Sequence, residues 1–209
     1  MKREMPSIQF VSPNWTEKEL QVGLPSLLDA GLKCFQLRLK NKSEAEIVST
    51  SRLAAKLCKE YNCLFVLNDY LHLWQECEAD VIHLGKNDAG ILEAKNILPE
   101  STIIGATCNT FEDVSHNHKL GVDYVCLGPF RFTSTKKNLS PILGLDGYKT
   151  ILELCSDNQI PLPIYAIGGI EINDLESLKS VGLKHFAASS LFVGEKGVEN
   201  FKKALAIFK

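Results

Sequence analysis

The chain contains 209 residues, of which 45% are hydrophobic and 23% are charged, and its formal net charge is −2. This length fits one domain with a sizeable hydrophobic core, so we expect residues 1–209 to form a single domain. A net charge this close to zero gives no reason to expect a nucleic acid or an anionic membrane surface as a partner.

Short apolar runs alternate along the chain with longer stretches of helical periodicity. The apolar runs predict eight strands, at Ile8–Val11, Cys34–Leu37, Leu64–Leu67, Val81–Leu84, Ile103–Ala106, Tyr124–Leu127, Ile164–Ile167 and His185–Ala188. Helical spacing is found at Glu17–Ala30, Ser43–Glu60, Ala89–Ile97, Thr110–His118, Leu145–Cys155, Ile172–Val181 and Val198–Phe208. Gly31, Gly121 and Gly182 each precede a strand, in the position expected of a glycine that ends the preceding helix.

Strands that alternate with helices indicate a parallel sheet with helical crossovers. Eight such units in 209 residues predict a (β/α)₈ TIM barrel at the small end of the size range of that fold. The alternative is an open, doubly wound α/β sheet, but no Gly-x-Gly-x-x-Gly motif follows the first strand. In a TIM barrel the active site lies at the C-terminal ends of the strands, so polar residues there are the candidates for function.

Cysteine usage and hydropathy indicate a cytoplasmic protein. The seven cysteines are an odd number, are widely scattered and show no Cys-x-x-Cys or Cys/His ligand spacing. This usage suits small hydrophobic residues in a reducing compartment. The segment from Met1 to Gln9 lacks the apolar core of a signal peptide, and no apolar run approaches the roughly 20 residues that a membrane helix needs.

The second strand leads into alternating polar residues. Period-2 alternation places Gln36, Arg38 and Lys40 on one side, with Leu37 and Leu39 on the other. An amide, a guanidinium and an amine that converge on the barrel mouth would suit a phosphate chain. The alternative is an ordinary solvated strand end.

Carboxylates follow the third and fourth strands, where Asn68-Asp69 and, further on, Asp88 occur. Because neighbouring parallel strands lie about 4.8 Å apart, Asp69 and Asp88 could share one cation. Mg²⁺ favours one or two carboxylates together with waters and substrate phosphates. The alternative is that Asp88 is the N-cap of the next helix. We expect His83 to lie in the core or behind the site, and Lys86 to be solvated.

Two later segments are further candidates for phosphate contacts. After the sixth strand, Thr133, Thr135 and Lys136 lie in a long polar loop, which is either functional or an ordinary surface loop. After the last two strands come Gly168-Gly169 and Ser189-Ser190, where many TIM barrels bind phosphate through backbone amides and a short helix N-terminus. The sequence therefore predicts two anion sites, and two phosphorylated small molecules as ligands.

Taken in order, these residues resemble the thiamine phosphate synthase family from about Gln9 to Phe192. The resemblance rests on the motifs Gln36-Leu37-Arg38-x-Lys40, Asn68-Asp69, His83-Leu84-Gly85-x-x-Asp88, Gly128-Pro129, Thr133-x-Thr135-Lys136-Lys137, Ile167-Gly168-Gly169-Ile170 and Ser190. It implies a transferase of thiamine biosynthesis that joins hydroxymethylpyrimidine diphosphate to hydroxyethylthiazole phosphate and releases diphosphate.

The resemblance also implies a role for each candidate residue. The residues implied to hold the pyrimidine diphosphate are Gln36, Arg38, Lys40, Asn68 and Lys136, with Arg38, Lys40 and Lys136 as the catalytic cations. Asp69 and Asp88 would bind Mg²⁺, and Thr107, where the family usually has serine, would contact the pyrimidine. The residues implied to receive the thiazole phosphate are Thr133, Thr135, Gly169, Ser189 and Ser190.

The chain departs from the family pattern at several positions. Tyr70 replaces an arginine that often follows Asn-Asp, Lys86 replaces a glutamine, and Leu39 replaces an acidic residue. Phe130-Arg131-Phe132 stands where an aliphatic-Tyr-Pro run is common. These departures concern substrate details and efficiency more than the class of ligand.

Two alternative functions stay open at this point. A related thiazole tautomerase uses a histidine after the fifth strand, where this chain has Asn109. A non-catalytic relative that binds phosphorylated ligands is the second alternative. The sequence also leaves a homo-oligomer open.

Overall fold

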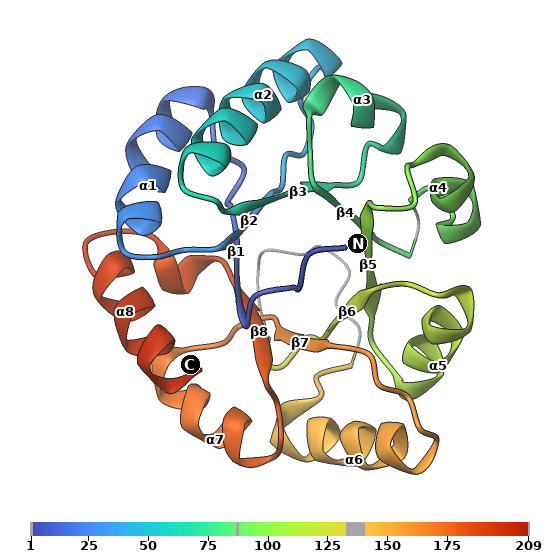
Figure 1. The fold of residues 1–209 in the computed structure, drawn as a ribbon. Helices are drawn as coiled ribbons and strands as arrows, with labels where there is room; N and C mark the ends of the chain where they lie inside the picture. Colours follow the sequence, from blue (N-terminus) through green and yellow to red (C-terminus); the bar gives the residue numbers. More distant parts are fainter. Residues whose placement is uncertain (1, 87, 133–140, 209) are drawn as a thin grey trace.

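Eight parallel strands form a closed barrel surrounded by helices in a computed structural model that describes residues 2–86, 88–132 and 141–208 (Figure 1). The strands are β1 (Ile8–Val11), β2 (Cys34–Leu37), β3 (Leu64–Asn68), β4 (Val81–Leu84), β5 (Ile103–Cys108), β6 (Tyr124–Leu127), β7 (Ile164–Ile167) and β8 (His185–Ala188). The α-helices are α1 (Glu17–Asp29), α2 (Glu44–Glu60), α3 (Trp74–Cys77), α4 (Ile91–Ile97), α5 (Phe111–Leu120), α6 (Gly144–Asp157), α7 (Leu175–Ser180) and α8 (Gly197–Ile207).

The pairing of the first strand with the last closes the sheet. Each strand pairs in parallel with its sequence neighbours, and β1 also pairs with β8 through Ile8 opposite Phe186 and Phe10 opposite Ala188. The predicted TIM barrel is therefore confirmed, and the open doubly wound sheet is excluded. Six predicted strands match the observed bounds, while β3 extends to Asn68 and β5 extends to Cys108.

Local sequence signals explain where several helices begin and end. Thr16, Ser43 and Thr110 each accept a hydrogen bond from a backbone amide of the first helical turn, in capping boxes that start α1, α2 and α5. Gly121 ends α5 with φ +72°, a left-handed conformation that glycine adopts without a steric penalty. Gly31 and Gly182 also have positive φ after α1 and α7, as predicted.

The connection between β3 and β4 contains short helices that the sequence did not indicate. A 3₁₀ turn, η1 (Leu71–Leu73), runs directly into the four-residue α3. One helical turn is too short to show a 3.6-residue period, which explains why no helix was predicted there. Two further 3₁₀ turns, η2 (Ile172–Asp174) and η3 (Ser190–Phe192), follow β7 and β8.

Two hydrophobic cores hold the fold together. The larger lies between the barrel and the surrounding helices, and the smaller fills the barrel interior with residues such as Val66, Val81, Tyr124 and Tyr165. All seven cysteines are free and buried, in keeping with their predicted use as small hydrophobic residues. Among the described helices, none has both the length and the apolar character needed to span a bilayer.

Gly105 gives a direct test of packing inside the barrel. A Cβ atom at Gly105 would overlap the ring of Tyr124, its register partner on β6. We expect Gly105→Ala to lower the free energy of unfolding by about 2 kcal/mol, because the fully buried ring must shift within a close-packed interior. Urea denaturation measures the change.

Gly90 supplies the control, since a Cβ there meets no atom within 4 Å and φ is −67°. Gly90→Ser adds a side chain in open space and gives α4 a favourable N-cap, so stability should stay the same or rise slightly. Equal stability of wild type and Gly105→Ala would contradict the packing described.

Candidate active site

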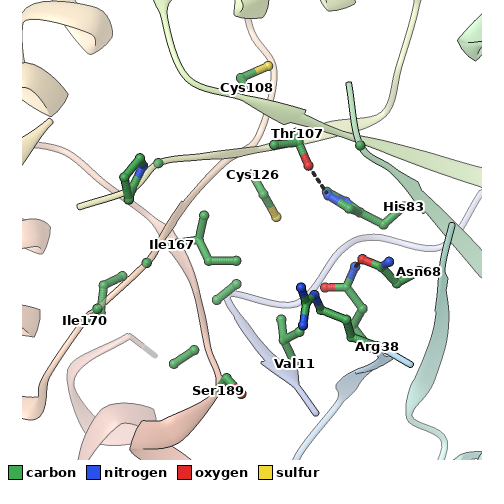
Figure 2. Close-up of a pocket in the computed structure, with 18 of the residues that line it drawn as sticks. Val11, Arg38, Asn68, His83, Thr107, Cys108, Cys126, Ile167, Ile170 and Ser189 are labelled. Atoms are coloured by element: carbon green, nitrogen blue, oxygen red, sulfur yellow. Dashed lines mark hydrogen bonds between the residues drawn. The ribbon is translucent and has the colours of Figure 1, made fainter. Parts of the chain in front are cut away.

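A pocket opens at the carboxyl ends of the strands, where the sequence predicted the site. All ten predicted site residues that the structure describes line this one pocket: Gln36, Arg38, Lys40, Asn68, Asp69, Asp88, Thr107, Gly169, Ser189 and Ser190. Figure 2 shows Arg38, Asn68 and His83 on one side of the pocket, with Ile167 and Ile170 across from them. The other three predicted residues, Thr133, Thr135 and Lys136, lie outside the described residues.

The chain that leaves β2 is fixed by side chains of the loop after β1. The Arg38 amide donates to Ser12 Oγ over 3.0 Å, and the Lys40 amide donates to Asn14 Oδ1 over 2.8 Å. The predicted alternation holds: Leu37 and Leu39 are buried in the outer core, while Gln36, Arg38 and Lys40 line the pocket. This strand end is therefore part of the pocket wall and not merely solvated.

Asp69, Asp88 and Lys40 form an ionic cluster at the pocket rim. Lys40 Nζ makes an ion pair with Asp69 Oδ2, and Asp88 Oδ2 accepts a 2.7 Å hydrogen bond from the Gly85 amide. Asp69 sits in the left-handed region with φ +63°, and its amide donates to the His83 carbonyl over 2.9 Å. The alternative role of Asp88 as an N-cap is wrong, because Gly90 holds that position at the start of α4.

The two carboxyl groups interact in a way that favours a bound cation. Loss of surrounding water, hydrogen bonding to Asp69 and repulsion by its charge raise the pKa of Asp88 to about 6. Within the described part of the chain, no cluster of three or more His, Cys, Asp or Glu side chains is arranged to hold a metal ion. Two adjacent carboxylates beside an open pocket instead match Mg²⁺, which completes its shell with water and substrate oxygens.

Below the rim, a polar network runs into the barrel. His83 Nε2 lies 3.0 Å from Thr107 Oγ1, and His83 Nδ1 lies 3.2 Å from the hydroxyl of Tyr124 (Figure 2 draws the first contact). Gln36 Nε2 donates to Asn68 Oδ1 over 3.3 Å. His83 is 5% exposed and lines the pocket, so the sequence was right to place it among buried residues but did not predict its contact with Thr107.

The opposite side of the pocket includes the turns that follow β7 and β8. Gly168 and Gly169 have φ values of +99° and +69°, which favour glycine. The amides of Gly168, Gly169, Ser189 and Ser190 have no hydrogen-bond acceptor among the described residues. Amides that line a pocket without an acceptor are suited to an anionic ligand.

Part of the pocket lining and two tertiary ion pairs could not be predicted from the sequence. The unassigned lining is largely apolar: Val11, Cys126, Pro129, Ile167, Ile170 and Ala187. Pro129, Ile167 and Ile170 belong to motifs of the resemblance but were given no role. For the others, hydrophobicity alone does not separate an apolar residue of a pocket from one of a core. Lys86 is exposed, as expected, and in addition pairs with Asp113 over 2.5 Å, while Arg131 pairs with Asp174 over 2.8 Å.

Comparison with known proteins assigns the chain to a family. A family model described as thiamine monophosphate synthase matches residues 8–192. The chain belongs to this family. It is 42% identical to a thiamine-phosphate synthase of Flavobacterium johnsoniae over 184 residues, which are 88% of this chain and 87% of the relative. It is 40% identical to a thiamine-phosphate synthase of Bacteroides fragilis over 204 residues, which are 97% of this chain and 100% of the relative.

Solved structures agree with this assignment. Thiamine phosphate pyrophosphorylase from Pyrococcus furiosus superposes with a TM-score of 0.84 and 25% sequence identity, covering 97% of this chain and 95% of that chain. The thiamine phosphate pyrophosphorylase of Bacteroides thetaiotaomicron gives a TM-score of 0.69 at 20% identity over 97% of each chain, and this likeness supports the fold alone.

The raised pKa of Asp88 predicts a stability change in metal-free protein. A carboxyl group whose pKa is higher in the folded state lowers stability as the pH rises from 3.8 towards 6. Asp88→Asn should therefore raise the free energy of unfolding at pH 7.5 by about 0.5 kcal/mol, a small gain because solvent screens the exposed side of the group. The gain should vanish near pH 4, where the native carboxyl is protonated. Urea denaturation in EDTA at both pH values measures it, and a loss of stability at pH 7.5 would contradict the prediction.

Proposed function

We propose that the chain joins hydroxymethylpyrimidine diphosphate to hydroxyethylthiazole phosphate, giving thiamine phosphate and releasing diphosphate. One observation carries the proposal: in a member of this family, one pocket is lined by paired carboxylates, by cationic side chains and by residues whose amides have no acceptor in the described part of the chain. A pocket with two separate anion-binding walls suits a reaction between two phosphorylated molecules.

The diphosphate would lie against the wall formed by β2 and β3. Arg38 offers a planar fork and Lys40 a compact positive charge, which together suit the oxygens of a phosphate chain. Gln36 and Asn68 contribute amide groups, already oriented towards each other by their hydrogen bond. Lys136, proposed as a further cation, lies outside the described residues.

Asp69 and Asp88 would hold Mg²⁺ at the same wall. Their close approach and the raised pKa of Asp88 fit a pair of carboxylates that a divalent cation would satisfy. When bound, Mg²⁺ would supply positive charge that neutralises the oxygens of the diphosphate. Lys40 makes an ion pair with Asp69. When Mg²⁺ binds to Asp69, Lys40 would be free to pair with the diphosphate instead.

The pyrimidine ring would lie deeper, beside Thr107. The hydroxyl of Thr107 contacts His83, and the hydroxyl of Tyr124 contacts the other ring nitrogen of His83. The Thr107 hydroxyl therefore has a defined orientation. Apolar residues such as Val11 and Cys126 line the pocket and would contact the faces of an aromatic ring. The thiazole phosphate would bind across the pocket at Gly169, Ser189 and Ser190, with Thr133 and Thr135 as further proposed contacts.

The proposed reaction is dissociative and uses no protein nucleophile. The bond between the pyrimidine methylene carbon and the diphosphate oxygen breaks, and both bonding electrons leave with the diphosphate. Arg38 and Lys40 stabilise the negative charge that grows on the leaving group. The thiazole nitrogen then donates its lone pair to the cationic methylene carbon. The protein contributes electrostatic stabilisation and orientation of the two reactants.

The tautomerase alternative is disfavoured by the residue that follows β5. Asn109 Nδ2 donates to the Gly128 carbonyl over 2.5 Å, and an amide cannot exchange protons as an imidazole does. The retained Asp69 and Asp88 pair also favours release of diphosphate. We place the reaction in the cytoplasm, because the seven buried, free thiols suit a reducing compartment.

One assay separates the synthase from both alternatives. Purified protein is mixed with both substrates, with and without Mg²⁺, and thiamine phosphate and diphosphate are followed by chromatography. We expect both products in equal amounts and only with Mg²⁺. Tautomerised thiazole without thiamine phosphate would indicate an isomerase, and tight substrate binding without any product would indicate a non-catalytic relative.

Asp69→Asn tests the proposed role of the carboxylate pair. Asparagine tolerates the left-handed backbone at this position, so the fold should survive, while the loss of one anionic ligand should lower kcat by about 1,000-fold. Steady-state kinetics and circular dichroism measure both effects. Asp157→Asn, at the exposed end of α6, is the matched control and should keep full activity. Activity of Asp69→Asn within about twofold of wild type would remove Asp69 from the mechanism.

A further inference from the structure

The glycine turn after β7 is held from one side by the segment that follows β6. Three consecutive carbonyl groups of this turn accept hydrogen bonds, each of 2.9 Å, from two adjacent residues. The Phe130 amide donates to Ile167, the Arg131 amide donates to Gly168, and Arg131 Nη1 donates to Gly169. One arginine thus binds two successive carbonyls, one through its backbone and one through its side chain.

This arrangement determines where the amides of the turn point. In a trans peptide, the carbonyl and the N–H of the following residue lie in one plane and point in nearly opposite directions. Because the carbonyls of Ile167, Gly168 and Gly169 all face residues 130 and 131, the amides of Gly168, Gly169 and Ile170 face away from them. All three residues line the pocket. Successive amides on one side of a turn form a concave site for an anion.

Arg131 is itself held firmly. Its guanidinium makes a bidentate ion pair with Asp174, in which Nη1 and Nη2 each lie 2.8 Å from a carboxylate oxygen. The same guanidinium stacks over the ring of Phe130 at 5.2 Å from the centroid. A planar fork with several donors is what allows one side chain to bind Asp174 and Gly169 together.

The two backbone segments at this contact lie too close together to accommodate a side chain at either glycine. A Cβ on Gly169 would lie 2.9 Å from the Phe132 carbonyl oxygen and 3.2 Å from Arg131 Cβ. A Cβ on Gly168 would lie 2.9 Å from Pro129 Cα. The two segments are therefore in direct backbone contact, and the side chain of Arg131 adds a hydrogen bond to the Gly169 carbonyl beside it.

We propose that Arg131 is a positioning residue for the second substrate: it holds the Gly169 carbonyl away from the pocket so that the amides of the turn can bind the thiazole phosphate. The proposal deepens the proposed function and rests on it for the identity of the ligand. Arg131 does not touch the ligand in this account. It acts through the orientation of the turn, and its loss frees the Gly169 carbonyl to rotate towards the phosphate and repel it.

The test compares Arg131→Met with wild type in two binding experiments that need no turnover. Calorimetry gives the Kd of hydroxyethylthiazole phosphate in EDTA, and separately the Kd of the pyrimidine diphosphate with Mg²⁺. We expect the first Kd to rise about 10-fold, the usual effect of losing one charged hydrogen bond, and the second to change by less than about twofold.

Two further variants make the result specific. Arg131→Lys keeps the charge but cannot bind Gly169 and Asp174 together, so its Kd for the thiazole phosphate should rise by only about threefold. Arg52→Met is the matched control, because Arg52 lies on α2 and donates to the Glu76 carbonyl on the outside of the barrel. It should leave both constants at the wild-type values.

Each outcome bears on the proposal. Unchanged affinity of Arg131→Met for the thiazole phosphate overturns it, and so does an equal loss of affinity for both substrates, which would show a general structural role. Weaker binding of the thiazole phosphate alone supports it. Absence of thiamine phosphate formation by wild type would reject the proposed function, but the two binding constants would still decide the role of Arg131.

Discussion

Closure of the barrel between β1 and β8 is the constraint on which the site depends. Without this pairing, the polar residues after β2 and the glycine turn after β7 would lie at distant parts of an open sheet. With it, the carboxyl ends of all eight strands surround one opening. Residues separated by more than 130 positions in the sequence, such as Arg38 and Gly169, then line the same pocket.

The site contains features that lower stability and that the cores must offset. Asp69 and the adjacent Tyr70 both occupy the left-handed region, with φ +63° and +47°, where side chains other than glycine are uncommon. Partial burial, and then the adjacent Asp69 carboxyl group, raise the pKa of Asp88. Such local conflicts are typical of functional sites, and here Asp69 and Asp88 lie together in the pocket, while two hydrophobic cores pack inside and around the barrel.

Most of the fold and much of the pocket could be predicted from the sequence because both follow local patterns. Strands buried on both faces appear as short apolar runs, and the residue types that come just after each run are those that a parallel barrel gathers at one end. Alternation alone separated Gln36, Arg38 and Lys40 from Leu37 and Leu39. The remaining features depend on partners far away in the chain: His83 with Thr107, Lys86 with Asp113, and Arg131 with Asp174. No local spacing predicts which of these residues contact each other. For the same reason the sequence could not distinguish a pocket role for Asp88 from an N-cap role, because Asp88 lies just before a helix.

Three of the residues that depart from the family pattern make tertiary contacts in the structure. Tyr70 donates its hydroxyl to the Leu39 carbonyl over 3.1 Å, so two of the substituted positions contact each other. Lys86 links the loop after β4 to the start of α5 through Asp113. Arg131 joins the loops after β6 and β7. Tyr70, Lys86 and Arg131 therefore each make a contact between neighbouring segments of the chain.

We propose that Asp69, Asp88, Arg38 and Lys40 together bind a divalent cation and a diphosphate in one pocket. The most direct measurement is an anomalous diffraction map of crystals soaked with Mn²⁺ and inorganic diphosphate. We expect one manganese peak in contact with both carboxylates and with diphosphate oxygens, and the diphosphate in contact with Arg38 and Lys40. A manganese ion bound away from either aspartate, or a diphosphate bound elsewhere on the barrel, would contradict it.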